Sequence, residues 1–144
     1  MEAALALART AERLGEVPVG AVVVQAGRIV GRGHNRTRLD RDPTAHAEIV
    51  ALREAAQALG SERLGDCDLH VTLEPCAMCA GAISHARIRR LYFGAADPKG
   101  GGVEHGPRLF RQPTCHHAPE VYGGFAEREA RALLRAFFAS RRDA

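Results

Sequence analysis

The sequence predicts an α/β fold, a three-layer α/β/α sandwich around a central mixed sheet of about five strands. Short runs rich in β-branched residues alternate along the chain with segments of helical periodicity. No internal repeat or low-complexity tract interrupts this alternation. Strands separated by helices are typical of a sheet that helices cover on both faces. With 144 residues, 46% of them hydrophobic, the chain is long enough for one domain, residues 1–144, with a substantial core.

The first half of the chain predicts a helix, a β-hairpin and a second helix. Residues 2–14 are alanine-rich and form a helix that ends at a glycine. Residues 19–25 and 28–33 flank an Ala-Gly turn, and the nearly continuous apolar run of the first indicates a strand buried on both faces. We expect the second helix over residues 44–59. Its buried stripe is expected at Ile49, Leu52 and Ala56.

The second half predicts strands at 67–73 and 88–93, with a helix between them from the cysteine turn to about Ile83. A glycine-rich loop with little regular structure follows over residues 94–106, and a short fifth strand is expected at residues 121–122. The last helix has an apolar stripe opposite arginines and glutamates. The stripe consists of Ala126, Ala130, Leu133, Leu134, Phe137 and Phe138.

The charged residues and the cysteines limit the partners, the location and the cysteine chemistry that the protein can have. The net charge is +3, the pI is near 8.9, and Lys99 is the only lysine. This arginine-based charge allows an RNA partner, but a solvated basic surface explains it equally well. The first residues lack a secretory signal pattern, and no apolar run is long enough to cross a membrane. We therefore expect a cytoplasmic protein, whose four cysteines serve metal or redox chemistry rather than disulfides.

One stretch carries the chemistry: Cys76 and Cys79 follow Pro75 at the expected start of a helix. Cysteines at i and i+3 lie on one helix face, so both sulfurs can reach a single ion. The positive end of the helix dipole favours the thiolate, which is the form that binds metal. Two thiolates and one imidazole make three tetrahedral zinc ligands and leave a fourth position for water, the pattern of catalytic sites.

His46 and Glu48 supply the rest of the predicted site. Residues at i and i+2 do not share a helix face. In the first turn after Pro43, however, both side chains can project past the helix end toward one point. His46 could then bind zinc while Glu48 reaches the water without touching the metal.

Two other interpretations of the cysteines stay open. The spacing Cys76-x-x-Cys79 also occurs in redox pairs of the thioredoxin kind. A structural zinc site could instead recruit Cys67 or Cys115 as a fourth ligand, which would close the position needed for water.

The arrangement His46-Ala47-Glu48 followed by Pro75-Cys76-Ala77-Met78-Cys79 resembles the H-x-E…P-C-x-x-C signature of the zinc deaminases. The resemblance is closer to the bacterial tRNA-specific adenosine deaminase family, within the cytidine deaminase-like fold. It covers most of the chain and is weakest over residues 97–124, where Cys115-His116-His117 departs from the family pattern. The similar segments are residues 16–21, 42–49, 72–76, 78–83 and 93–95.

The resemblance implies a role for each of six residues. His46, Cys76 and Cys79 would bind one Zn²⁺ per subunit, and the metal would make hydroxide available near neutral pH. Glu48 would be the proton shuttle while the zinc-bound hydroxide attacks C6 of adenine. Asn35 matches a residue that contacts the target nucleoside, and Asp97 one that lies against a flanking ribose.

The implied reaction is hydrolytic deamination of adenosine to inosine at the wobble position of a tRNA anticodon. The implied partners are the anticodon stem-loop, with an arginine tRNA expected, and a second subunit in a homodimer. Two alternatives remain. One is a zinc-dependent deaminase of a free base or nucleoside such as guanine or cytosine. The other is a zinc-stabilised RNA-binding module without catalysis.

Overall fold

The computed structural model describes residues 1–142 of the chain. Within these residues it contains four α-helices, five strands and one 3-10 turn. The helices and strands follow the predicted order, whereas the 3-10 turn was not predicted. In chain order they are α1 (Glu2–Arg13), β1 (Gly20–Gln25), β2 (Arg28–His34), α2 (Ala47–Leu59), β3 (Cys67–Leu73), α3 (Ala77–Ala86), β4 (Arg90–Ala95), η1 (Leu109–Arg111), β5 (Glu120–Tyr122) and α4 (Glu127–Arg142).

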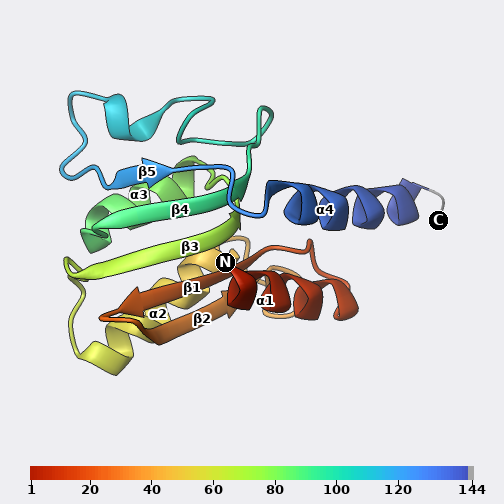
Figure 1. Ribbon diagram of the computed structural model, residues 1–144, viewed down its shortest axis with the longest axis horizontal. Coiled ribbons are helices and arrows are strands. Elements are labelled where there is room, and N and C mark those ends of the chain that lie inside the picture. The colour runs from red at the N-terminus through yellow and green to blue at the C-terminus, as the bar shows by residue number, and fades with distance from the viewer. Residues whose placement is uncertain (143–144) are drawn as a thin grey trace.

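The five strands form one mixed sheet with the order β2-β1-β3-β4-β5. Strand β1 is antiparallel to β2 and β3, whereas β3, β4 and β5 are parallel. Helices α1 and α4 lie in front of the sheet and α2 and α3 behind it (Figure 1). The predicted three-layer sandwich is confirmed. Because β3 and β4 are parallel, the segments that follow them begin at the same edge of the sheet.

Helix α2 lies unusually close to β2 because two glycines leave room for its backbone. A Cβ placed on Gly33 would lie 2.3 Å from the carbonyl oxygen of Ala47, and one on Gly31 would lie 2.3 Å from that of Ala51. The helix accordingly buries its small residues against the strand. The expected stripe was wrong in part, because Leu52 is buried but Ile49 and Ala56 are only half-buried. The buried residues of α2 are Ala47, Glu48, Ala51, Leu52 and Ala55.

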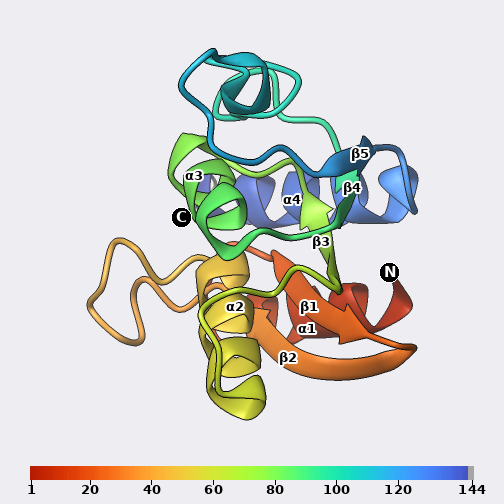
Figure 2. The ribbon, with the colours of Figure 1, turned by 90° about the vertical axis from the view of Figure 1, so that its left-hand side faces the viewer.

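Several expected boundaries were also wrong by two or three residues. Helix α2 begins at Ala47 rather than Thr44, because Asp42 accepts hydrogen bonds from the backbone N–H and hydroxyl of Thr44 and holds a turn there. Helix α3 continues past Ile83 to Ala86 and ends where Arg87 adopts a positive φ of 65°. Strand β4 is displaced to Arg90–Ala95, since pairing with β3 continues to the end of that strand. Two longer connections, residues 35–46 and 96–119, stand out from the strands (Figure 2).

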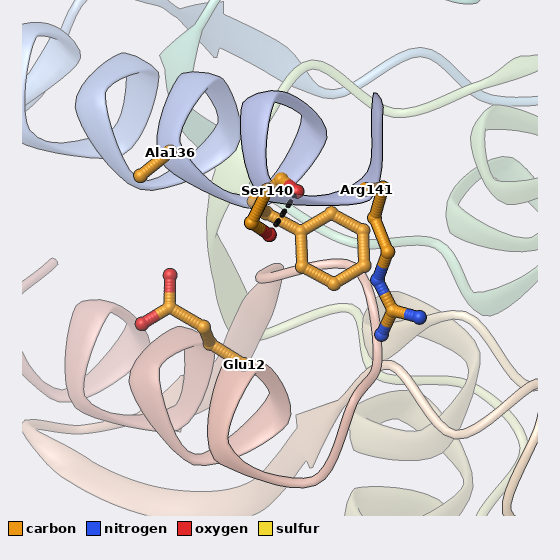
Figure 3. A pocket seen from close by; sticks show the side chains of 5 residues that line it. Glu12, Ala136, Ser140 and Arg141 are labelled. Carbon is orange, nitrogen blue, oxygen red and sulfur yellow. Dashed lines mark hydrogen bonds between the residues drawn. The ribbon is translucent and has the colours of Figure 1, made fainter. Parts of the chain in front are cut away.

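Helix α4 is covered on only part of its apolar stripe. Ala130 is buried beside Leu5 and Ala95, but Phe138 is 48% exposed. Near its end the helix faces α1 across a hollow, where Ser140 donates a hydrogen bond to the carbonyl of Phe137 (Figure 3). The guanidinium of Arg141 lies 4.7 Å from the centroid of the Phe137 ring. It also donates to the carbonyl of Gly15 at 2.9 Å, which ties α4 to the end of α1. None of the helices within residues 1–142 has both the length and the apolar character needed to span a bilayer.

The contact between α2 and β2 predicts a large cost for a single methyl group. Replacing Gly33 by alanine should lower the free energy of unfolding by roughly 2 kcal/mol, because the added carbon collides with the backbone of α2. The measurement is urea denaturation followed by circular dichroism. Gly65→Ala is the matched control, since the nearest atom to its new Cβ lies 4.0 Å away. Equal denaturation midpoints for the two variants would contradict this packing.

Candidate metal centre

The starts of two helices converge at one edge of the sheet. His46 is the N-cap of α2, with φ −72° and ψ 155°, and Cys76 is the N-cap of α3, with φ −72° and ψ 176°. Both residues have extended backbones, so their side chains are not confined to a helix face. Cys79 and Glu48 lie in the first turn of their helices. The unpaired N–H groups of both helix ends make this a positive environment that stabilises thiolates.

The three predicted metal ligands lie at the spacing of a tetrahedral zinc site. The Nδ1 atom of His46 is 3.6 Å from the Sγ of Cys76 and 3.5 Å from the Sγ of Cys79. All three atoms lie within 4.8 Å of one another. Zinc–sulfur and zinc–nitrogen bonds at a tetrahedral angle place these atoms about 3.6 Å apart. The residues therefore fit zinc without rearrangement.

Neither of the two remaining cysteines approaches this cluster. Cys67 is buried, its thiol lies 3.6 Å from an oxygen of Asp66, and burial raises its pKa to about 11. The thiol of Cys115 contacts the carbonyl of His117 at 3.2 Å. Within residues 1–142, the ligand triplet is the only group of three or more potential metal ligands. Three protein ligands are typical of catalytic zinc and argue against the closed structural site.

The cysteines are electrostatically prepared to bind a cation. A hydrogen bond from Cys79 is the main reason that the pKa of Cys76 is lowered to about 4, against the opposing effect of burial, and the proximity of His46 adds to the shift. The same hydrogen bond raises the pKa of the Cys79 thiol well above its usual range. The arrangement favours a thiolate at Cys76, and Cys79 must lose its proton to bind a metal as a thiolate. Because binding releases protons, metal affinity should rise with pH.

Glu48 is placed beside the metal ligands without joining them. Its side chain is buried, and its carboxylate lies outside the triplet of mutually close ligand atoms. The pKa of Glu48 is raised to about 7, mainly because the group is buried; the charge of Cys76 contributes to the rise, whereas a backbone hydrogen bond, the charge of His46 and a hydrogen bond with Cys79 oppose it. A carboxyl group with a pKa near neutrality can both accept and return a proton, which suits general acid–base chemistry.

The residues implied by the resemblance line one cavity of about 810 Å³ together with His46, Glu48 and Cys76. Asn35 enters it from the end of β2, and its Oδ1 accepts a hydrogen bond from the backbone N–H of Ala47 at 3.2 Å. Asp97 enters it from the loop after β4, and its Oδ1 accepts from the N–H of Gly100 at 2.9 Å. The structure therefore brings both of these residues to the mouth of the metal centre.

Comparison with known proteins agrees with this geometry. Residues 1–95 match the family model of the cytidine and deoxycytidylate deaminase zinc-binding region. A tRNA-specific adenosine deaminase of Agrobacterium fabrum is 62% identical over 142 residues, which cover 99% of this chain and 93% of the relative. The chain belongs to the zinc-dependent tRNA adenosine deaminase family.

Two solved structures are similar to this chain, one from the same family and one of a deaminase that acts on a free base. One, from a study of A-to-I editing by tRNA:A34 deaminases at the wobble position of transfer RNA, is 63% identical with a TM-score of 0.92. The match covers 93% of this chain and 97% of the other. A guanine deaminase from Nitrosomonas europaea is 27% identical with a TM-score of 0.81, and the match covers 94% and 81% of the two chains.

The deaminase cavity also contains residues that the sequence did not point to. Leu134 and Phe138 were expected only as core residues of the last helix, yet both line the cavity.

Two buried glutamates hold the loops around the cavity. Glu16 accepts hydrogen bonds from the backbone N–H groups of the loop after Asn35, and Glu74 does the same for the loop after β4. Burial favours a raised pKa for Glu74, but these hydrogen bonds outweigh it and hold the pKa below its ordinary value. The sequence signal that could have identified both glutamates is an acidic residue adjoining an apolar strand. Such a residue is expected to be buried, and a buried carboxylate needs hydrogen-bond donors.

The ligand set predicts the outcome of cysteine substitutions. Cys79→Ala should reduce bound zinc from one per chain to nearly none and lower the melting temperature, because metal binding contributes to folding. Zinc can be measured by mass spectrometry of the purified protein. Cys115→Ala removes the same atom outside the cluster and should keep one zinc per chain. A full complement of zinc in the Cys79 variant would contradict the assignment.

Proposed function

We propose that this protein catalyses the hydrolytic deamination of adenosine to inosine at the wobble position of the tRNA anticodon. It acts as one zinc-dependent deaminase domain, residues 1–144, with one zinc per subunit. The observation that carries this proposal is the convergence of a His-Cys-Cys triplet and a buried, non-ligating glutamate in a cavity that also holds Asn35 and Asp97. The 62% identity to a tRNA-specific adenosine deaminase supports the choice of substrate.

The proposed mechanism assigns the proton transfers to Glu48. Zinc bound by His46, Cys76 and Cys79 supplies a water with a pKa lowered toward neutrality. The carboxylate of Glu48 accepts a proton from the water whose oxygen attacks C6 and delivers it to N1 of adenine. It then accepts the remaining proton of the new C6 hydroxyl and passes it to the exocyclic nitrogen as the C6–N6 bond breaks and ammonia leaves. A pKa near 7 allows the same group to act in both directions.

Asn35 and Asp97 can orient the nucleoside with the groups that the fold leaves available. Because the Oδ1 of Asn35 accepts from Ala47, the side chain is fixed and its NH₂ can donate to the substrate. The Oδ1 of Asp97 is used by the N–H groups of Lys99 and Gly100. The second carboxylate oxygen can accept a hydrogen bond from a ribose 2′-OH, which distinguishes RNA from DNA.

A basic surface beside the cavity favours RNA as the substrate. A second hollow shares Lys99, Leu134 and Phe138 with the catalytic cavity and extends along α4 to Arg135. Within residues 1–142, neither Lys99 nor Arg135 forms an ion pair. Both cations can therefore contact phosphates, while the exposed ring of Phe138 offers a surface for stacking. A free base has no phosphate for these cations to contact.

We also propose that the deaminase works in the cytoplasm as a homodimer, with an arginine tRNA as substrate. The outer face of α2 and α3 supports a dimer, because it carries a hollow with mostly apolar walls and Met78 is 39% exposed on the same helix pair. Apolar surface of this kind is typical of interfaces. The walls of the hollow include Ile49, Leu52, Ala56, Leu64, Ala82 and Ala86.

The assignment of the proton shuttle predicts that Glu48→Gln lowers kcat by at least about a hundredfold while zinc stays bound. Glutamine preserves the shape of the side chain but cannot accept and return a proton. Turnover and zinc content should be measured on the same preparation. Glu129→Gln makes the same change at an exposed position on α4 and should leave both unchanged. Substantial deamination by the Glu48 variant would contradict its role.

A substrate panel tests the function itself. The purified protein is offered an arginine-tRNA anticodon stem-loop with adenosine at the wobble position, and separately free adenosine, guanine, cytosine and cytidine. We expect inosine only in the stem-loop, with an affinity that falls steeply as salt is added. Release of ammonia from guanine or another free base, with no inosine in RNA, would favour the alternative function. RNA binding without any product would favour a non-catalytic module.

The basic surface provides a matched pair of variants for the same assay. Arg135→Glu should weaken stem-loop binding by about tenfold because a phosphate contact is replaced by repulsion. Arg28→Glu, at the exposed end of the β1–β2 hairpin, makes the same charge reversal and should leave binding unchanged.

A further inference from the structure

Glu74 is buried and accepts five hydrogen bonds from a single loop. Its side chain has no exposed surface. One carboxylate oxygen accepts from the backbone N–H of Asp97 at 3.0 Å and from the Nδ1 of His105 at 2.8 Å. The other accepts from three consecutive backbone N–H groups, those of Val103, Glu104 and His105, at 3.2, 2.9 and 3.1 Å. The loop over residues 97–105 therefore folds around one carboxylate.

The same residue lies two positions before the metal ligand Cys76. The backbone of this segment contacts the loop as well, because Gly102 donates to the carbonyl of Pro75 at 2.8 Å. The loop approaches so closely that a Cβ on Gly101 would lie 2.4 Å from the carboxylate of Glu74. Likewise, a Cβ on Gly102 would lie 2.6 Å from the backbone nitrogen of Ala77. The distance between the start of α3 and the Asp97 loop is thus fixed by direct contact.

From this arrangement we infer that Glu74 is a positioning residue for the substrate. It holds the Asp97 loop at a fixed position relative to the metal centre. Asp97 can then contact the flanking ribose while the reacting base lies at the metal. The inference rests on the proposed function, because it assigns Asp97 to the sugar of RNA. Glu74 belongs to the wall of the cavity, but its side chain has no exposed surface and its carboxylate is occupied by the loop, so it acts through the loop.

The isosteric change Glu74→Gln removes this function without leaving a cavity. Both carboxylate oxygens are needed as acceptors, since one faces two donors and the other three. An amide offers one acceptor, and its NH₂ group must face two or three N–H donors. The loop should detach on that side and carry Asp97 with it.

The experiment compares zinc-loaded wild-type protein with Glu74→Gln, Asp97→Asn and the matched control Glu104→Gln. Glu104 lies in the same loop with an exposed side chain. Each protein is tested on the wobble-adenosine stem-loop and on the same stem-loop with 2′-deoxyribose at the flanking nucleotides. Zinc content and amide hydrogen exchange are measured in parallel.

For Glu74→Gln we expect one zinc per chain, a KM raised about tenfold and a kcat within about threefold of the wild type. The 2′-deoxyribose stem-loop should bind more weakly than the ribose stem-loop to the wild type and to Glu104→Gln. Glu74→Gln and Asp97→Asn should bind the two stem-loops equally. Exchange at residues 97–105 should accelerate, while that of α2 stays unchanged. His105→Ala, which removes one of the five donors and keeps the carboxylate, should show the same changes in smaller measure.

Unchanged exchange at residues 103–105, loss of zinc, or a reduced kcat at unchanged KM would each overturn the inference. Failure of the proposed function is distinguishable. If the wild type leaves the stem-loop unmodified, RNA deamination is wrong, and hydrogen exchange alone decides whether Glu74 holds the loop. If Asp97→Asn remains sensitive to deoxyribose while Glu74→Gln is not, Glu74 positions a ribose contact other than Asp97.

Discussion

The structure depends on the meeting of two helix N-termini at one edge of the sheet. His46 and Cys76 occupy equivalent positions, each the last extended residue before a helix. Their side chains reach one point, while the backbone N–H groups behind them create a positive field. That field, with the hydrogen bond from Cys79, stabilises a thiolate at Cys76. The same converging geometry places Glu48 close to the metal site but outside the ligand triplet. The division between the proposed metal ligands and the proposed proton carrier therefore follows from helix placement.

Two buried carboxylates fix the conformation of the loops around the cavity. The loops that carry Asn35 and Asp97 bury few apolar side chains, such as Ala45 and Val103, so packing contributes only part of what holds them. Glu16 and Glu74 are nearly inaccessible to solvent and collect the backbone N–H groups of these loops. A buried charge is tolerated only when its hydrogen bonds are satisfied, so each loop has one favourable arrangement. These hydrogen bonds hold the irregular loops in one conformation, as hydrogen bonds to a neighbouring strand would hold a strand.

Most of the fold could be predicted because the periodicity of the hydrophobic residues and the positions of the turn residues indicate the same elements along the chain. The hairpin turn, the order of strands and helices and the short fifth strand follow from local patterns. Spacing also placed His46, Cys76 and Cys79 in one cluster, since helix starts constrain the directions of side chains. The stripe of α2 was misjudged because the contact is set by Gly31 and Gly33 on another strand, which hydrophobic periodicity cannot reveal. The partners of Glu74 lie 23 to 31 residues away, and local pattern carries no information about such contacts.

The glycines of β2 have a consequence for how the enzyme can change. They put the carbonyl of Ala47, the first residue of α2 after the ligand His46, within touching distance of a strand at the sheet edge. Because α2 packs directly on β2, a shift of the hairpin would move the start of that helix and with it His46. New substrate preferences should arise by altering the loops around residues 36–42 and 97–105, whose backbones are held by side chains. The hairpin, by contrast, cannot shift without moving His46, which the structure places among the metal ligands.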